Sequence, residues 1–573
     1  MALVGSAVAT AVALILQNGA RTGWQVRSLP ERTMEWLLLF VPLDLFERAL
    51  GQFGSHAKEI ALYGTMLGML VVLIAIGALS LRRGLHSWAL LGVGVALWLF
   101  AMAVVMPLTG AGLFATRLMF SPLLTSAAYL LVFLGYASAL VAVRVLATGQ
   151  QTRGPMMMGE RRVLLAGLAG ALAAGAVARI VGRDGGLVGS SLPLASVPTR
   201  QATAEPTSTT VVQPNPTVGS GTLANTAATA VAQPTVAATP TTDPLLSPPP
   251  PRPVTRDSEG SLTAAGRPRG ELAPTITANN DFYIVTKNAV ADPVVDAATW
   301  RLIVDGEVNN PIQLDFRTLR ALPAVEVTKT LECISNFTAG CNLTTFGCDL
   351  ISTARWRGAR LSDVLDLAGG LKASTVALAF VSVDEFSAGL PASIADDPEA
   401  LLVYEMNGQS LPREHGFPVR LLVPGRYGMK NPKWLAGIRA MTQNYQDWYE
   451  QRSWNKDGIV KTMSRIDLPV DGTTLAAGDH RVAGISYAGD RGLMGVEIST
   501  DDGDTWRAAR LLEPMAGKDV MVRWEATFSI ARGETITVTV RATDGTGVIQ
   551  TDDFQLPQPD GASGRDAVTV SAA

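Results

Sequence analysis

The residue best suited to chemistry in this sequence is Cys333, which directly follows the strand-like stretch Val325–Glu332. A thiolate at the end of a strand can present a soft sulfur ligand to a metal ion. The alternative is a buried structural thiol, because free cysteine is among the most buried residue types. With only 3 cysteines in 573 residues, the residue type alone leaves both roles open.

Three ordered motifs give this cysteine a context. The first is TLECISN around Cys333, continued by LISTARWRG at Leu350–Gly358; the others are HGFPVRLLVPGRYGMKNPKWL at His415–Leu435 and DWYEQRSW at Asp447–Trp454. Together they resemble the sulfite oxidase superfamily of molybdopterin-dependent oxidoreductases, of a membrane-anchored bacterial type. The resemblance implies that the Cys333 thiolate binds molybdenum beside the two dithiolene sulfurs of the pterin.

The resemblance also implies a set of cofactor-binding residues. An arginine at position 420 offers a bidentate fork for the cofactor phosphate, and the imidazole of His415 offers one more hydrogen bond. For the two residues in the early motif NDFY, a packing role is the open alternative. The residues that match the family's cofactor contacts are Asn280, Tyr283, His415, Arg420, Asn431 and Lys433.

Two departures from the family concern the substrate pocket. Asp384 and Phe386 match the segment near the active-site mouth, and many relatives have tyrosine where Phe386 stands, so a hydroxyl donor is lost here. Sulfite oxidases proper also have an arginine soon after the cysteine, where this chain has Ile334–Asn336. Lys287 is the candidate replacement for that charge. We therefore expect an enzyme of this family without naming sulfite as its substrate.

The other two cysteines, Cys341 and Cys348, lie in an insertion after the first motif. Outside the cytoplasm two such thiols are expected to form a disulfide that closes a small loop. Without a matching histidine or cysteine they would make a poor zinc site. The loop is placed to shape the rim of the substrate pocket.

The N-terminal third predicts a membrane domain, residues 1–184. Hydrophobic residues make up 48% of the chain and its mean hydropathy is +0.24, which is high for a soluble protein. A signal-peptide core is the alternative for the first apolar run, but no basic residue precedes it. The expected spans are Ala2–Leu16, Ile60–Leu81, Trp88–Leu108, Leu124–Leu146 and Val163–Val181.

Basic residues in two short loops predict the orientation. Arg82–Arg83 and the cluster from Arg144 to Arg162 fit the cytoplasmic side, which places everything after the last span outside. The loop Asn18–Glu59 disagrees, because its basic residues would then lie outside. Arg161–Arg162, before an Ala/Gly-rich span, also resembles a twin-arginine export signal, with two cytoplasmic anchors as the alternative.

Four further regions follow the membrane domain. A Thr/Ala/Pro-rich stretch containing SPPPPRP indicates a disordered stalk. Mixed runs such as Leu361–Leu367 and Val376–Val383 indicate an α+β domain, and short runs between Gly/Asp turns indicate an all-β, immunoglobulin-like sandwich of the kind often used in dimerisation in the family. The expected bounds are 185–275 for the stalk, 276–458 for the molybdopterin domain, 459–557 for the sandwich and 558–573 for a flexible tail.

The residue inventory also bears on partners. The chain has 4 histidines and no CxxCH motif, so we expect no haem or iron–sulfur centre and a separate redox partner, either a cytochrome or a quinone-linked protein. The net charge of −3 gives no support for nucleic-acid binding.

The function predicted from these observations is two-electron oxygen-atom transfer between a small molecule and an extracytoplasmic molybdenum centre. One alternative within the family is a reductase of sulfoxides, including methionine sulfoxide. The alternative outside it is a cofactor-free, membrane-tethered binding or adhesion protein. Homodimers are compatible with either class.

Overall fold

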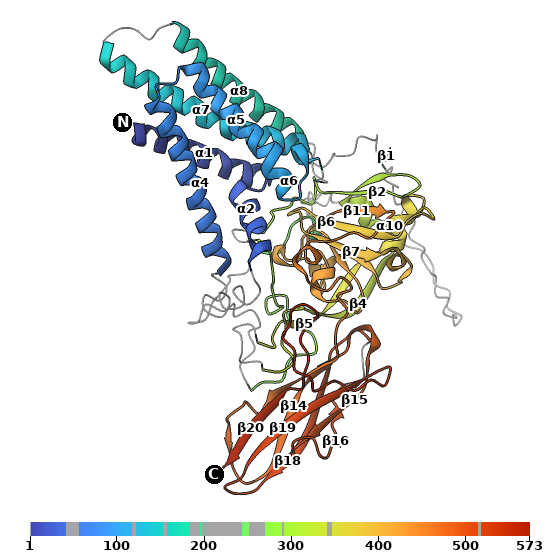
Figure 1. Cartoon of the computed structure of the whole chain (residues 1–573). Coiled ribbons are helices and arrows are strands. Elements are labelled where there is room, and N and C mark those ends of the chain that lie inside the picture. Colours follow the sequence, from blue (N-terminus) through green and yellow to red (C-terminus); the bar gives the residue numbers. More distant parts are fainter. Residues whose placement is uncertain are drawn as a thin grey trace, which may run out of the picture.

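The structure is a computed structural model that describes residues 2–41, 57–116, 118, 122–152, 158–183, 195–196, 243–250, 270–288, 292–340, 347–513 and 517–573. Its described parts form a helical bundle, a mixed α/β part and a C-terminal all-β part, arranged one after another along the molecule (Figure 1). Most of the predicted stalk lies outside the described residues. Of the predicted site residues, Cys341 also lies outside them.

The helical bundle contains the predicted spans. Five helical segments are long and apolar enough to cross a membrane: Ala2–Trp24, Glu59–Arg82, Ser87–Leu108, Pro122–Ala147 and Arg162–Arg179. They belong to α1 (Ala2–Trp24), α4 (Ala57–Arg82), α5 (Ser87–Phe100) with a π-helical turn and α6 (Met106–Leu108), α7 (Pro122–Thr152) and α8 (Met158–Arg183). The five predicted runs are confirmed as helices of this kind.

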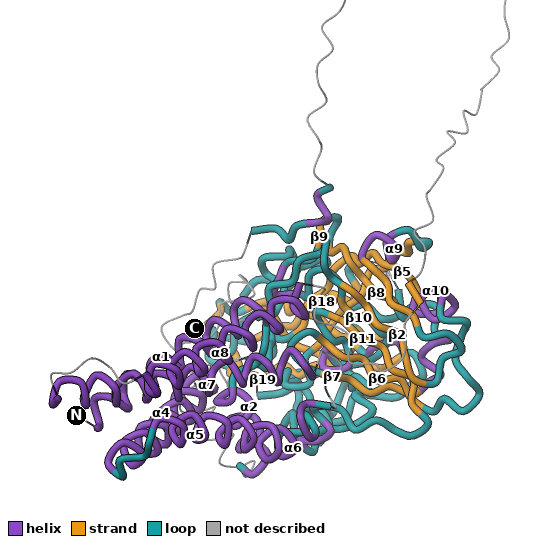
Figure 2. Tube along the Cα trace, turned by 90° about the horizontal axis from the view of Figure 1, so that it is seen from above, coloured by secondary structure: helices purple, strands orange, loops and turns teal. Residues whose placement is uncertain are grey.

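Small residues allow the helices of the bundle to approach closely. A Cβ atom added at Gly94 of α5 would lie 2.6 Å from the carbonyl oxygen of Phe133 and 2.7 Å from Cβ of Ala137, both on α7. Such contacts through glycine and alanine are typical of helix packing in membranes. Figure 2 shows the helices gathered into one bundle beside the strands of the rest of the chain.

The two loops predicted to face the cytoplasm lie at the same end of the bundle. Arg144 Nη1 donates a hydrogen bond to the carbonyl oxygen of Gly84, at 2.9 Å. The short helices α2 (Leu29–Leu37) and α6 lie at the opposite end, next to the α/β part (Figure 1). The described first part of the loop between the first two spans, whose charges disagreed with the predicted orientation, therefore contacts the α/β part.

Helix α2 has a well-defined start. The Ser28 side chain accepts a hydrogen bond from the Glu31 amide, the Glu31 carboxylate accepts one from the Ser28 amide, and Pro30 occupies the first turn. This capping box satisfies amide groups that a helix leaves unpaired at its N-terminus. This helix was not predicted from the sequence.

Two sheets build the α/β part. The first has the order β1-β3-β2-β11-β6-β7 and the second β10-β8-β5-β4, with β9 beside β8. In the first sheet β2 and β11 pair parallel, whereas all strands of the second pair antiparallel. The strands are β1 (Ala195–Ser196), β2 (Arg301–Gly306), β3 (Ile312–Asp315), β4 (Ala324–Glu332), β5 (Ile351–Arg360), β6 (Ala377–Ser382), β7 (Ser387–Pro391), β8 (Leu401–Met406), β9 (Gln409–Ser410), β10 (Arg420–Leu422) and β11 (Leu435–Met441).

One hydrophobic core serves both of these sheets. It includes Val304 of β2, Phe380 of β6, Trp356 of β5 and Leu402 of β8, all fully or almost fully buried. Helices α9 (Phe316–Arg320) and α10 (Leu361–Leu367) add to it, and α10 has the bounds that the sequence predicted. The α+β prediction agrees with this arrangement.

The C-terminal part consists of two sheets around a common core. Their orders are β12-β14-β18-β17 and β13-β20-β19-β15-β16, and Trp524 of the first sheet and Val540 of the second belong to the same buried cluster. The two-layered β architecture is observed, and its immunoglobulin-like character stays a prediction. The strands are β12 (Met463–Leu468), β13 (Thr474–Leu475), β14 (Gly478–Tyr487), β15 (Leu493–Ser499), β16 (Arg507–Ala508), β17 (Arg510–Leu511), β18 (Val522–Ile530), β19 (Thr535–Asp544) and β20 (Ala567–Ala572).

Two predicted boundaries need correction. The segment 558–573 is not a flexible tail: β20 pairs with β19 from Ala567 to Ser571 and buries Val568 and Val570, because its apolar residues alternate as in a half-buried strand. Within the predicted stalk, the described piece Asp243–Pro250 lies against the α/β part, where Asp243 forms an ion pair with Arg320.

Candidate functional site

A pocket with about 720 Å³ of empty space, part of it open to solvent, lies in the α/β part. Concave, mostly apolar pockets with a few polar groups are typical of small-molecule and cofactor sites. Nine residues that the sequence singled out line it: Tyr283, Lys287, Cys333, Asp384, Phe386, His415, Arg420, Asn431 and Lys433. The structure thus brings together segments that are far apart in the sequence.

Cys333 lies in a fixed loop immediately after β4. Its amide donates to the carbonyl oxygen of Leu350 and its own carbonyl accepts from the amide of Asn336, both at 2.9 Å. The Asn336 side chain in turn binds the amide of Leu350 and the carboxylate of Glu332. The thiol is 7% exposed and faces the pocket, which suits a metal-ligating sulfur held on a rigid support.

Arg420 on β10 is a buried cation with neutral neighbours. It donates to the carbonyl oxygens of Asn431 (3.0 Å) and His415 (3.3 Å), and it lies over the Trp356 ring. Among the described residues no salt bridge joins a carboxylate to it, Tyr283 is its coulombic partner, and its Nε has no hydrogen-bond partner. Burial lowers the pKa of Arg420 to about 10. A buried guanidinium of this kind needs an anionic ligand.

Lys433 supplies a second, partly buried cation to the pocket. Its Nζ donates to the carbonyl oxygens of Glu414 (2.8 Å) and Val285 (3.0 Å) and lies 4.5 Å from the centre of the Trp434 ring. Burial lowers the pKa of this ammonium group. The pocket therefore combines one thiol with two cations that are held by backbone carbonyls.

His415 and Gly416 shape the wall beside these cations. His415 Nε2 lies 3.2 Å from the carbonyl oxygen of Asn279, and because a carbonyl only accepts, Nε2 carries the proton. Gly416 has φ +111°, and a Cβ there would lie 3.0 Å from Cβ of Lys433 and 3.1 Å from Cβ of Arg420. Only glycine allows the chain to pass between the two cationic residues at this point.

The remaining predicted cofactor residues differ in their placement. Asn431 lines the pocket, but its side chain also accepts from the Val423 amide (2.7 Å) and donates to the Tyr427 carbonyl (3.1 Å), so it holds the loop. Tyr283 is buried in the wall, and burial raises the pKa of its hydroxyl. Asn280 is exposed and is not part of the pocket lining. The contact with His415 is made by the backbone carbonyl of the preceding residue, Asn279.

Phe386 and two further aromatic residues line or support the mouth. The Phe386 ring lies 5.8 Å from that of Tyr449 and 6.0 Å from that of Trp448. Tyr449 belongs to the motif DWYEQRSW but was not predicted as a site residue. The structure places it in the pocket lining. The three rings pack against one another, and Phe386 and Tyr449 form part of the pocket lining.

A buried carboxyl group next to Cys333 was not predicted. Glu332 is 3% exposed, and burial raises its pKa to about 8 although Asn336 and Arg465 oppose this. Below that pH the group is protonated and neutral, which is compatible with its apolar surroundings.

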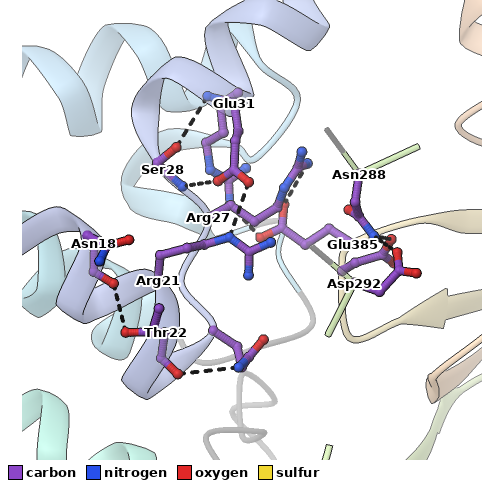
Figure 3. Close-up of polar contacts among 12 residues, drawn as sticks. Asn18, Arg21, Thr22, Arg27, Ser28, Glu31, Asn288, Asp292 and Glu385 are labelled. Carbon is purple, nitrogen blue, oxygen red and sulfur yellow. Dashed lines mark hydrogen bonds and ion pairs between the residues drawn. The ribbon is translucent and has the colours of Figure 1, made fainter. Parts of the chain in front are cut away.

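The mouth also receives residues from the helical bundle. Arg27 and Arg32 form ion pairs with Glu385, the neighbour of Asp384, and Glu35 of α2 lies 3.4 Å from Lys287 Nζ. Figure 3 shows Arg27 on the bundle side and Glu385, Asn288 and Asp292 on the α/β side, with Glu31 bonded to Ser28 and Arg21 within the bundle. In the sequence these basic residues indicated only a conflict with the predicted orientation.

The predicted disulfide is described at one of its two residues. Cys348 is disulfide-bonded and 3% exposed. Cys341 lies outside the described residues, so the pairing stays a prediction.

Comparisons with known proteins bear on the class of this site. The sequence model described as "Oxidoreductase molybdopterin binding domain" matches residues 289–449, which include Cys333, His415, Arg420 and Lys433. Fold and pocket thus define a molybdopterin-binding oxidoreductase domain. Sulfite oxidase from Arabidopsis thaliana is 31% identical over 339 residues, covering 50% of this chain and 86% of that protein. The chain belongs to the sulfite oxidase family of molybdenum-dependent oxidoreductases.

Other relatives match over smaller shares. The mitochondrial sulfite oxidase of Rattus norvegicus is 34% identical over 41% of this chain and 49% of its own length, so the chain spans about half of that relative. Among solved structures, the sulfane dehydrogenase SoxCD from Paracoccus pantotrophus aligns with a TM-score of 0.46 at 21% identity, over 52% of this chain and 82% of that chain. That likeness is too weak to add to the sequence relationship.

The pocket residues fit the cofactor of this family. Molybdopterin carries a phosphate and two dithiolene sulfurs, and the metal accepts a thiolate. The pocket offers a thiol at Cys333 and, in Arg420, a buried cation whose Nε has no partner among the described residues. Both requirements, for a soft donor and for compensation of an anion, are met within one cavity.

Proposed function

We propose that this chain is a membrane-anchored oxidoreductase that transfers an oxygen atom, with two electrons, to or from a small molecule at a molybdenum centre in this pocket. The observation that carries the proposal is the Cys333 thiol in a cavity that also contains two cations, the buried Arg420 and the partly buried Lys433. When bound, the molybdenum cofactor supplies the oxygen-atom and electron transfer chemistry.

In this proposal the protein binds, orients and shields the cofactor. The Cys333 thiolate is the protein ligand of the metal, while Arg420 and Lys433 bind the anionic part of the cofactor. His415 and Asn431 hold the two loops that carry these cations, through the carbonyl of Asn279 and the amide of Val423. Tyr283 lines the wall, and Phe386 limits water at the mouth.

We place the pocket on the outer side of the cell membrane, with the bundle as a multi-pass anchor. The disulfide at Cys348 supports this location, because disulfides persist in oxidising compartments. The basic loops also lie at the end of the bundle away from the pocket. The electrons are exchanged with a separate cytochrome or quinone-linked protein, and Arg161–Arg162 is the candidate export signal.

A sulfoxide reductase is the second candidate. Two observations favour it over sulfite oxidation: Phe386 lacks the hydroxyl that tyrosine provides in many relatives, and Lys287, the candidate anion-binding residue, lies between two carboxylates at 3.4 and 3.8 Å. Binding of an uncharged S-oxide requires neither a tyrosine hydroxyl at position 386 nor an unpaired positive charge at Lys287.

The test is the molybdenum and pterin content of the full chain, purified in detergent from a molybdenum-competent host. We expect one molybdenum per chain in the wild type, together with a molybdenum-centred EPR signal on partial reduction. Cys333→Ser replaces the thiolate by a hydroxyl of similar size and should change that signal. Ser335→Ala, two residues further on, is the matched control and should retain the wild-type spectrum.

Two results would overturn the proposal. One is a folded wild-type chain without molybdenum from a host shown to load a control enzyme, which would favour the cofactor-free binding protein. The other is a Cys333→Ser spectrum identical to that of the wild type. Turnover of sulfite and of a sulfoxide by the loaded chain, measured with artificial dyes, then separates the two candidate activities.

A further inference from the structure

The first extramembrane segment of the bundle, Gln25–Leu37, lies on the mouth of the pocket. Arg452 Nη2 donates to the carbonyl oxygen of Glu35, at 3.4 Å, and Arg32 forms an ion pair with Glu385. On the bundle side, the Tyr129 hydroxyl of α7 binds the carbonyl oxygen of Arg27, at 2.5 Å. The segment is thus held between the membrane helices and the catalytic part.

Charged side chains dominate this contact, and most of them are buried. Arg27, Arg32 and Glu35 are each less than 9% exposed, as is Lys287 on the catalytic side. Buried charges are costly unless they are paired, and here each has a partner of opposite sign. The contact therefore has a defined geometry and differs from a loosely solvated tether.

Glu35 is the member of this cluster that reaches a pocket residue. Its carboxylate lies 3.4 Å from Lys287 Nζ and receives 2 hydrogen bonds from Arg27. Burial alone would raise the pKa of Glu35, but Arg27 and Lys287 outweigh it and hold the pKa below its ordinary value. The group is therefore anionic at neutral pH. On the other side of Lys287, Asp384 lies at 3.8 Å.

We propose that Glu35, a residue of the membrane bundle, determines the charge preference of the active site by neutralising Lys287, so that uncharged substrates are admitted in preference to oxyanions. This inference rests on the proposed function. Lys287 lines the pocket, and with Glu35 in place it does not present an uncompensated positive charge to an entering anion. The bundle then forms part of the substrate site in addition to anchoring it.

A neighbouring carboxylate provides a matched control. Glu385 pairs with Arg32 and Arg27, and no ion pair joins it to Lys287 in the described part of the chain. Glu35→Gln and Glu385→Gln each remove one negative charge from the same contact. Only Glu35→Gln removes a direct partner of Lys287. The two variants therefore distinguish an effect on the charge of the pocket from an effect on the contact between the bundle and the α/β part.

The experiment measures the binding of inorganic sulfate to the full chain by isothermal titration calorimetry, without turnover. We expect Glu35→Gln to bind sulfate at least about fivefold more tightly than the wild type, because only Asp384, at 3.8 Å, would then offset the charge of Lys287 in this partly buried site. Glu385→Gln should stay within about twofold of the wild type, and the double variant Glu35→Gln/Lys287→Met should return to the wild-type affinity.

Equal effects of the two single variants, or no gain in Glu35→Gln, would overturn the proposal. Hydrogen exchange of residues 29–37 in each variant reports whether the segment is still docked. A tighter sulfate complex in Glu35→Gln that persists in the double variant also contradicts it, because the added affinity would not depend on Lys287. Molybdenum content, measured on the same samples, tests the proposed function separately.

Discussion

Lys329 Nζ lies 3.0 Å from Asp519 Oδ2, and this pair joins the strand that leads to Cys333 to the C-terminal β part. Asp519 also accepts from the Tyr487 hydroxyl (2.6 Å) and from the Gly425 amide (3.1 Å). Lys329 is 1% exposed. One buried ion pair thus fixes β4, the loop after β10 and the C-terminal part relative to one another.

Replacing Lys329 by methionine should destabilise this junction. The change leaves Asp519 buried without its cation, which costs about 3 kcal/mol, and the main calorimetric transition of the full chain should move to lower temperature. Lys372→Met is the control, because Lys372 is largely exposed and lies 3.8 Å from Glu307; its effect should stay below about 0.5 kcal/mol. Equal shifts in both variants would show that the buried pair contributes little.

Arg420→Met should have opposite effects on the loaded and the cofactor-free protein. Loss of the guanidinium should reduce pterin and molybdenum content about tenfold, since a charge-assisted hydrogen bond contributes about 1.5–3 kcal/mol. In cofactor-free protein the same change should raise stability by about 1 kcal/mol, because it removes a buried cation that lacks an anionic partner.

The comparison for this prediction is Arg426→Met. Arg426 lies in the same region of sequence but donates to the carbonyl oxygen of Asp457 outside the pocket lining. It should retain the wild-type cofactor content. A cofactor-free Arg420→Met protein that is less stable than the wild type would contradict the assignment of Arg420 as an anion site.

Gly416→Ala should lower the molybdenum content by more than the strain of a positive φ at alanine would cause. Both Gly416 (φ +111°) and Gly408 (φ +76°) have positive φ, so alanine is strained at either position, by about 1 kcal/mol. Only at Gly416 does the new Cβ meet other residues, Lys433 and Arg420, whereas Gly408 has open space around it. We expect lower molybdenum content in Gly416→Ala and wild-type content in Gly408→Ala; equal content in the two variants would rule out the crowding argument.

The C-terminal part should be more stable at mildly acidic pH than at pH 8. Burial raises the pKa of Asp566 to about 7, well above its ordinary value, although the amide of Ile466 and Arg465 oppose the shift. Between the ordinary and the raised pKa the folded state binds more protons than the unfolded state, so stability decreases as pH rises through this window. Asp566→Asn, which keeps an acceptor for Ile466, should remove this dependence.

The measurement for Asp566 is the calorimetric transition of the C-terminal part in the full chain at pH 5 and pH 8. Other groups also titrate in this window, and the difference between wild type and Asp566→Asn isolates the one carboxyl. A pH dependence that is the same in both proteins would assign the effect to other groups.

Short-range patterns in the sequence were sufficient for much of the fold and the site. Apolar runs predicted the five helices, because span length and hydropathy are local properties. The residues around Cys333 and those of HGFPVR lie in contiguous motifs, so a resemblance could identify them before any contact was known. The helix Leu361–Leu367 followed from periodicity alone.

The tertiary structure alone decided which distant segments meet. Glu35 and Lys287 are 252 residues apart, and no periodicity or motif relates two charged residues at that separation. Arg27 and Arg32 conflicted with the orientation rule in the sequence, and the structure pairs them with the carboxylates of Glu35 and Glu385. The strand β20 was predicted as part of a flexible tail, and its pairing with β19 became evident only in the structure. Local sequence determines helices, strands and motifs, whereas the pairing of buried charges depends on the packing of the whole chain.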